Sequence, residues 1–143
     1  MRKFVIFFII VILIVIIATF MYFDYKAKVD KQNSINYEFT SYLNKEIHGT
    51  DVATIINKAV YKNNKNEVNK DKKGNYINNN KNSINIDIKM LDDDKTYNME
   101  KIHKSGTMQF VEYYKNIKFK VTKIDYHEET GFVKYIYIEQ ISR

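Results

Sequence analysis

The sequence predicts an α+β protein: an N-terminal transmembrane helix, then a small domain of two helices packed on an antiparallel sheet of three or four strands. Three observations predict this. Residues 4–23 are uniformly apolar, apolar residues recur at helical spacing between residues 35 and 60, and apolar and polar residues alternate in the second half. At 143 residues, the chain has room for one modest domain beside the apolar segment.

The apolar segment FVIFFIIVILIVIIATFMYF, residues 4–23, contains no charged residue. A helix of this length, at ~1.5 Å per residue, spans the ~30 Å hydrocarbon core of a bilayer. It exceeds the about 7–15 apolar residues of a secretory signal peptide, and it ends in bulky residues where a cleavage site needs small ones. We therefore expect an uncleaved transmembrane signal anchor over residues 1–23 and a polar stalk over residues 24–34.

The membrane orientation depends on the charges that flank the anchor. Arg2 and Lys3 precede it, while Lys26, Lys28 and Lys31 follow it, so the positive-inside rule separates the two sides poorly. A short basic N-terminus before a long apolar run usually stays in the cytoplasm. We therefore expect a single-pass protein of the cell membrane, with its N-terminus cytoplasmic and its C-terminal domain outside.

The formal net charge of +6 is unevenly distributed along the chain. Residues 24–61 carry five basic and five acidic side chains, and residues 83–143 carry ten of each. An excess of +4 lies within residues 62–82. A nucleic-acid-binding protein needs its basic groups on a structured face. This distribution argues against a nucleic-acid partner.

Two apolar stripes with helical spacing begin the predicted domain, residues 35–143. The first comprises Ile35, Phe39, Tyr42, Leu43 and Ile47, and the second comprises Val52, Ile55, Ile56, Ala59 and Val60. In one continuous helix with ~100° per residue, the two stripes would face roughly 125° apart. We therefore predict two helices, with a break at Gly49 and with Thr50 or Asp51 capping the second helix.

Residues 62–82 are rich in Asn and Lys and have almost nothing to bury, so we expect a flexible loop there. Val68, Tyr76 and Ile77 leave room for a weak hairpin. Strand structure is predicted next in SINIDIKM, residues 83–90, where isoleucine and methionine alternate with polar residues.

The remaining elements follow from short patterns. LDDDKT is a turn, residues 96–106 fit a short strand or one helical turn, and residues 107–115 fit a short helix with Met108, Val111 and Tyr114 facing inward. Alternation then changes parity between Val121 and Ile124, which indicates a β-bulge. HEETG supplies a hairpin turn, and FVKYIYIEQI, residues 132–141, is apolar on both faces as a central strand should be.

No catalytic or metal site follows from the histidines. His48 stands beside Thr50 and Asp51, but side chains this close at a helix start seldom form a catalytic set. His103 has no recognisable partner, and His127 lies in an acidic hairpin that reads as a solvated turn or a weak surface metal site. We expect no enzyme activity and no cofactor.

Asp92, Asp93 and Asp94 raise the question of calcium. Aligned as an EF-hand loop beginning at Asp92, the sequence places Tyr97 at the required glycine and His103 at the bidentate glutamate. The calcium pattern fails, and a charged turn explains the three aspartates.

Tyrosine is the one residue whose abundance suggests binding, with twelve in the chain. Tyrosine provides rigid, amphipathic contact area and is enriched in interfaces, although it also favours strands. The candidate binding face comprises His48, Tyr113, Tyr114, Tyr126, Tyr135 and Tyr137.

The strings IHGTDVATIINKAVYKNN, SINIDIKM, TYNMEKI, GTMQFVEYY and IDYHEETGFVKYIYIEQI resemble a group of small uncharacterised membrane-anchored proteins of low-GC Gram-positive bacteria. The resemblance implies a bacterial cell envelope setting and carries no catalytic residues. The order of elements is also similar to that of type IV pilins and pseudopilins. This chain lacks their processing glycine before the apolar segment and their glutamate early within it.

Two functional hypotheses follow. The first is a non-enzymatic envelope protein whose extracytoplasmic domain binds another envelope protein or itself, within a secretion or pilus-like apparatus. The alternative is a ligand-binding or sensory domain with a pocket between the helices and the sheet, bounded by His48, the second helix and the Tyr135 strand.

Overall fold

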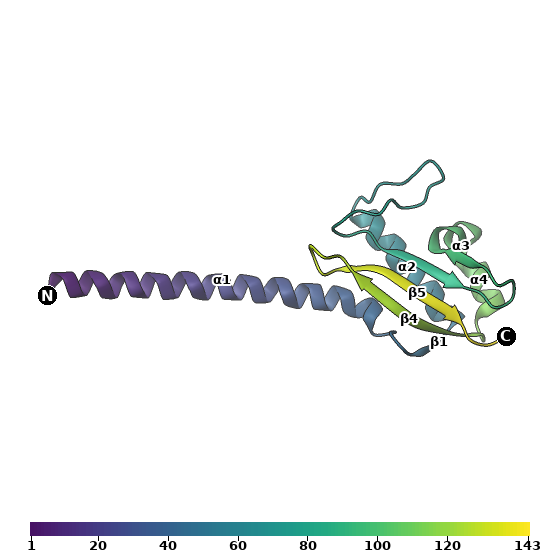
Figure 1. Ribbon diagram of the computed structural model, residues 1–143, viewed down its shortest axis with the longest axis horizontal. Coiled ribbons are helices and arrows are strands. Elements are labelled where there is room, and N and C mark those ends of the chain that lie inside the picture. Colours follow the sequence, from purple (N-terminus) through teal and green to yellow (C-terminus); the bar gives the residue numbers. More distant parts are fainter. The chain divides into compact units, whose positions relative to one another are not determined.

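The computed structural model describes residues 1–143, and its fold is α+β, as predicted (Figure 1). The chain divides into two compact units, Met1–Ile35 and Asn36–Arg143. The elements in chain order are α1 (Arg2–Thr40), β1 (Glu46–His48), α2 (Gly49–Lys65), β2 (Asn85–Lys89), β3 (Thr96–Asn98), α3 (Met99–Ser105), α4 (Thr107–Tyr114), β4 (Lys118–Tyr126) and β5 (Val133–Gln140).

The first unit is helical and consists of most of α1. This helix is long and apolar enough to cross a membrane. Its apolar side chains are exposed all round, a pattern that water disfavours and lipid accommodates. The Thr19 hydroxyl donates to the Val15 carbonyl oxygen at 2.7 Å, so this polar group is satisfied within the helix.

The second unit is built on one five-stranded sheet with the order β1-β4-β5-β2-β3. The prediction of a wholly antiparallel sheet of three or four strands was wrong, because β2 and β5 pair in parallel. The edge strands β1 and β3 have three residues each, too short for alternation to reveal them. Strand β5 is central, as its apolar character on both faces predicted.

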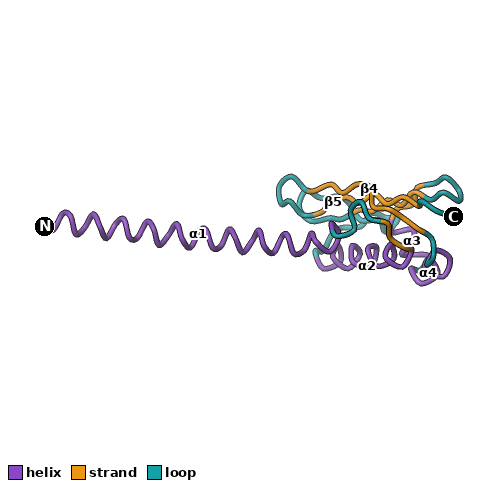
Figure 2. The backbone as a smooth tube through the Cα atoms, turned by 90° about the horizontal axis from the view of Figure 1, so that it is seen from below, coloured by secondary structure: helices purple, strands orange, loops and turns teal.

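Helices α2, α3 and α4 lie on one side of the sheet (Figure 2). The second predicted stripe is confirmed, since Val52, Ile55, Ile56, Ala59 and Val60 of α2 are all buried. In α4, however, the prediction that Met108 faces inward was wrong. Phe110 is the buried residue of that helix, and Met108 is 76% exposed.

The break between the first two helices exists, but its form differs from the prediction. Helix α1 ends at Thr40, and Ile47 is buried in strand β1 instead of in a helix. Gly49 does not turn the chain, because it is the first residue of α2 and its φ is not positive. Asp51 does cap α2, since its carboxylate accepts the His48 backbone N–H at 3.0 Å.

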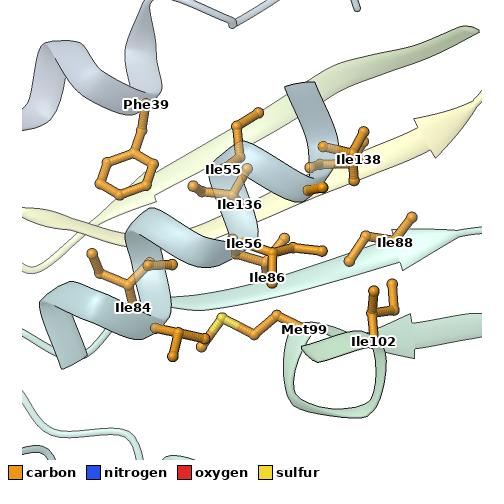
Figure 3. Packing of buried hydrophobic residues seen from close by; sticks show 14 of the residues in the cluster. Phe39, Ile55, Ile56, Ile84, Ile86, Ile88, Met99, Ile102, Ile136 and Ile138 are labelled. Atoms are coloured by element: carbon orange, nitrogen blue, oxygen red, sulfur yellow. The ribbon is translucent and has the colours of Figure 1, made fainter. Parts of the chain in front are cut away.

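The core fills the space between α2 and the sheet (Figure 3). Ile55 and Ile56 of α2 share one buried cluster with Ile136 and Ile138 of β5, and the predicted alternation in β2 is confirmed by its buried isoleucines. Because these side chains occupy the space between the second helix and the Tyr135 strand, the pocket postulated there is filled by core.

Residues 62–65 continue α2, so the helix extends into the segment predicted as loop. Hydrogen bonds hold residues 62–82 to the domain at three places. The Asn63 side chain bonds both backbone groups of Ile84, at 2.7 and 2.8 Å. Buried Tyr76 donates its hydroxyl to Asn64 at 2.7 Å and its N–H to Glu100 at 3.1 Å. The predicted hairpin is present as a single Lys70–Tyr76 bridge.

The predicted bulge is confirmed by a register shift between Val121 and Lys123, where β4 pairs with β5. The turn that follows is also as predicted, with Gly131 at φ 65° and its N–H donated to the His127 carbonyl oxygen at 2.8 Å. The expectation of a solvated His127 was wrong, because this residue is buried and its Nε2 lies 2.8 Å from the Ser83 carbonyl oxygen.

Candidate functional site: an aromatic cleft beside α3 and α4

The structure separates the residues of the candidate binding face into groups. Tyr135 and Tyr137 lie on the sheet face opposite the helices, because Ile136 and Ile138, which alternate with them, enter the core. His48 ends edge strand β1 and Tyr126 ends β4, both exposed. Tyr113 and Tyr114 belong to α4, on the helix side of the sheet.

The open sheet face has little unused binding capacity at Tyr135. Its hydroxyl donates to the Asp87 carboxylate at 3.0 Å, and the Lys123 ammonium lies 5.8 Å from its ring centroid. Partial burial, with the Asp87 carboxylate beside it, raises the pKa of the Tyr135 phenol well above its usual range. The polar groups around this tyrosine therefore satisfy one another.

Tyr113 and Tyr114 instead line a cleft of about 350 Å³. Its walls come from three consecutive parts of the chain: the β2–β3 turn, α3 and α4. The lining residues are Met90, Asp92, Asp93, Tyr97, Lys101, Ile102, Ser105, Gly106, Gln109, Phe110, Tyr113 and Tyr114.

Local sequence signals position the two helical walls. The Asn98 side chain accepts the Lys101 backbone N–H at 3.0 Å and so begins α3 directly after β3. Gly106, at φ 100°, separates α3 from α4 in a conformation that side chains disfavour. A single residue therefore joins the two short helices, and both of them line the cleft.

Packing against the core fixes the floor and inner wall of the cleft. Met90, Ile102 and Phe110 are each less than a tenth exposed. The Phe110 ring lies 4.8 Å from that of Tyr114 and 6.0 Å from that of buried Phe119, measured between centroids. Aromatic contacts of this kind hold the Tyr114 ring between core and cleft.

The three aspartates of the β2–β3 turn differ in their partners. Asp94 pairs with Lys89 at 2.6 Å, and Asp93 pairs with Lys95 at 3.9 Å while accepting the Tyr97 hydroxyl. Asp92 forms no ion pair; its carboxylate accepts the Gln140 side-chain N–H at 3.4 Å and hydrogen-bonds with the Tyr114 hydroxyl. One carboxylate of the cleft therefore carries an uncompensated charge.

The tyrosines of the cleft register this negative charge. Burial, reinforced by the charge of Asp92, raises the pKa of Tyr114. The hydrogen bond between Tyr97 and Asp93 raises the pKa of the phenol and lowers the pKa of the carboxyl. At the same wall, the Lys101 ammonium lies 4.2 Å from the centroid of the Tyr97 ring.

The cleft combines apolar contact area with polar groups. Aromatic and apolar surfaces provide contact area, while two carboxylates, the Gln109 amide and the Lys101 ammonium provide polar groups at its edges. No histidine lines the cleft, so Ser105, which carries its one aliphatic hydroxyl, has no imidazole base within the lining. Nowhere in the chain do three His, Asp or Glu side chains gather closely enough to hold a metal ion.

Sequence reasoning found Tyr113 and Tyr114 but missed Asp92, Tyr97 and Lys101. Asp92 was interpreted only as part of a charged turn, and Tyr97 as part of a short strand or helical turn. A usable signal was present, because an acidic turn, a tyrosine and a lysine follow one another within ten residues, 92–101. Asp92, Tyr97 and Lys101 line the same cleft as α4 only in the folded chain.

No protein-family model, no curated protein and no solved structure matches this chain.

Proposed function

We propose that this chain is a non-enzymatic, membrane-anchored protein of the bacterial cell envelope whose domain binds another protein at the aromatic cleft. Helix α1 serves as the single-pass signal anchor, with the N-terminus cytoplasmic and residues 36–143 outside. The observation that carries the proposal is the cleft of about 350 Å³ that joins Tyr113 and Tyr114 to the acidic β2–β3 turn. A secretion or pilus-like apparatus is the setting we propose for the partner.

The size and surface of the cleft support a protein partner. Its volume is at the lower end of the about 300–1,000 Å³ typical of ligand sites, which suits one or two inserted side chains. The cleft does not stand alone, because Tyr113 at its edge is 73% exposed and Met108 of the same helix is 76% exposed. Tyrosine and methionine are enriched in protein interfaces.

Site-specific crosslinking in intact cells tests the proposal. A photoreactive amino acid at Tyr113 should form one dominant crosslink to a membrane or envelope protein, identified by mass spectrometry. The same amino acid at Tyr61, which is 65% exposed on α2 and does not line the cleft, is the matched control. Equal crosslinking from both positions, or none from Tyr113, would contradict a protein-binding role for the cleft.

Topology is tested in the same cells. With a peptide tag after Arg143, protease added to intact cells should remove the tag without lysis. A tag that survives until the membrane is broken would reverse the proposed orientation.

The second candidate function is ligand sensing, and the buried floor of Met90, Ile102 and Phe110 favours it, because a small apolar molecule could rest there. If the ligand is a small molecule, extraction of the purified protein should release a stoichiometric compound. Gly106→Leu, which adds a side chain at the cleft, should then abolish copurification.

A further inference from the structure

We infer that the cleft takes the side chain of a lysine or arginine from the partner protein, with Asp92 as the counter-ion and the tyrosine rings around its stem. This inference rests on the proposed function and names the chemistry that the partner must present. It excludes a carboxylate or phosphate group as the inserted element.

The charge of the cleft favours a cation. Two carboxylates and one ammonium line the cleft, so its formal charge is negative, whereas the remainder of residues 36–143 carries an excess of positive charge that lies within residues 62–82. Asp93 already has Lys95, but Asp92 has no cation within ion-pairing distance. A carboxylate without an ion-pair partner at the edge of an apolar cleft is favourable for an incoming cation and unfavourable for an anion.

The aromatic wall of the cleft also favours a cation. Ammonium and guanidinium groups are attracted to the faces of tyrosine rings within about 6 Å of the centroid. The chain demonstrates this geometry with its own residue, because the Lys101 ammonium lies 4.2 Å from the Tyr97 ring centroid and forms no ion pair. A partner's cation would use the same surface, nearer to Asp92.

The apolar floor of the cleft suits the stem of a long basic side chain. Lysine and arginine carry a cation at the end of an apolar stem, and such side chains bury the stem while the charge remains at a polar edge. Met90, Ile102 and Phe110 offer apolar surface of this kind, and Asp92 lies at the end of the β2–β3 turn beside it. The arrangement of apolar floor and anionic edge matches the arrangement within the side chain.

The experiment uses the full chain in nanodiscs of uncharged lipid, with its five methionines labelled at the methyl group for NMR. The probes are n-butylguanidinium, 1-butanol and butyrate, which share an apolar stem and differ in charge. Butylguanidinium should shift the Met90 methyl signal saturably, whereas butanol should shift it several-fold less and butyrate least. Equal shifts from all three probes, or preference for butyrate, would overturn the inference.

Three variants sharpen the test. Asp92→Asn should weaken butylguanidinium binding by about two- to fivefold, the scale of one exposed ion pair. Lys101→Gln removes the competing cation and should tighten binding. Asp94→Asn removes the same charge from the same turn but outside the cleft, and it should leave binding unchanged. Equal weakening by Asp92→Asn and Asp94→Asn would show only a diffuse field and would contradict the inference.

Crosslinking from Tyr113 separates this inference from the proposed function. A partner crosslinked through a segment without lysine or arginine would overturn the inference and leave the protein-binding function standing. No crosslink together with Asp92-dependent butylguanidinium binding would leave the ligand chemistry standing and overturn the protein partner.

Discussion

Gly49 and Tyr114, 65 positions apart, are in such close contact that a Cβ atom on Gly49 would lie 2.2 Å from the Tyr114 carbonyl oxygen. The first residue of α2 therefore packs directly on the last turn of α4, which forms one wall of the cleft. The role of this glycine is close approach between helices, not chain reversal.

Gly49→Ala should destabilise the domain. The new methyl group meets backbone and the Tyr114 Cβ, neither of which can rotate away, so we expect a loss of about 1–3 kcal/mol in unfolding free energy. Urea denaturation followed by circular dichroism measures it. Thr50→Ala, at the exposed neighbouring position, is the control and should change stability by less than half as much. A Gly49→Ala protein as stable as the wild type would show that α4 does not pack on α2 in this way.

Asn63 should be among the residues most important for stability. It is fully buried, and its amide joins α2 to the start of β2 through two bonds to the Ile84 backbone. Asn63→Ala leaves a buried N–H and a buried carbonyl unpaired, which costs about 2–3 kcal/mol. Asn57→Ala, on the exposed side of the same helix, should be nearly neutral by the same urea measurement. Equal stability of the two variants would contradict the buried contact.

Limited proteolysis should find cleavage in residues 62–82 confined to the part between the anchored side chains. Lys70, Lys72 and Lys73 are exposed, whereas Val68 and Tyr76 on either side are buried. Brief trypsin treatment should cut at these lysines while the fragments stay associated, as mass spectrometry and gel filtration would show. Tyr76→Ala should extend cleavage to Lys65 and Lys81. Full resistance of the wild-type segment would show that no part of it is mobile.

Stability should fall in alkaline solution through Tyr135. Its folded-state pKa is raised above the ordinary value of 10.0, so the folded protein holds this proton more tightly than the unfolded chain does. The stabilisation is complete below about pH 10 and is lost as the pH rises further. The stability difference between wild type and Tyr135→Phe should therefore be constant up to about pH 10 and shrink as the pH rises above it in urea titrations. A difference independent of pH would contradict the raised pKa of this half-buried phenol, and Asp87→Asn should reproduce part of the effect.

The membrane anchor should fail when charge is placed at its centre. Each arginine at the middle of a transmembrane helix costs about 2.5–3.5 kcal/mol on insertion scales. The double variant Ile10→Arg, Leu13→Arg should thus move from the carbonate-resistant membrane fraction to the soluble fraction. The matched Ile10→Ala, Leu13→Ala protein should stay with the membrane. Retention of the arginine variant in the carbonate-resistant fraction would show that α1 is not what holds the protein there.

The regular elements with a long, periodic burial pattern could be predicted from the amino-acid sequence. The apolar helix, the stripe on α2, the alternation in β2, the bulge in β4 and the central position of β5 were all predictable, because each depends on the spacing of side chains along one segment. The turn at Gly131 was predictable for the same local reason.

The short strands, the parallel pair of β2 and β5 and the cleft depend on contacts between segments that are distant in the sequence. Strands β1 and β3 are too short to show a period, and they exist because the edges of β4 and β2 offer backbone partners. Gly49 could not be interpreted from the sequence, since the Tyr114 carbonyl that excludes a side chain there comes from a distant helix. The cleft likewise forms where the β2–β3 turn and α3 lie beside α4. The spacing of residues along the chain does not predict such contacts between segments.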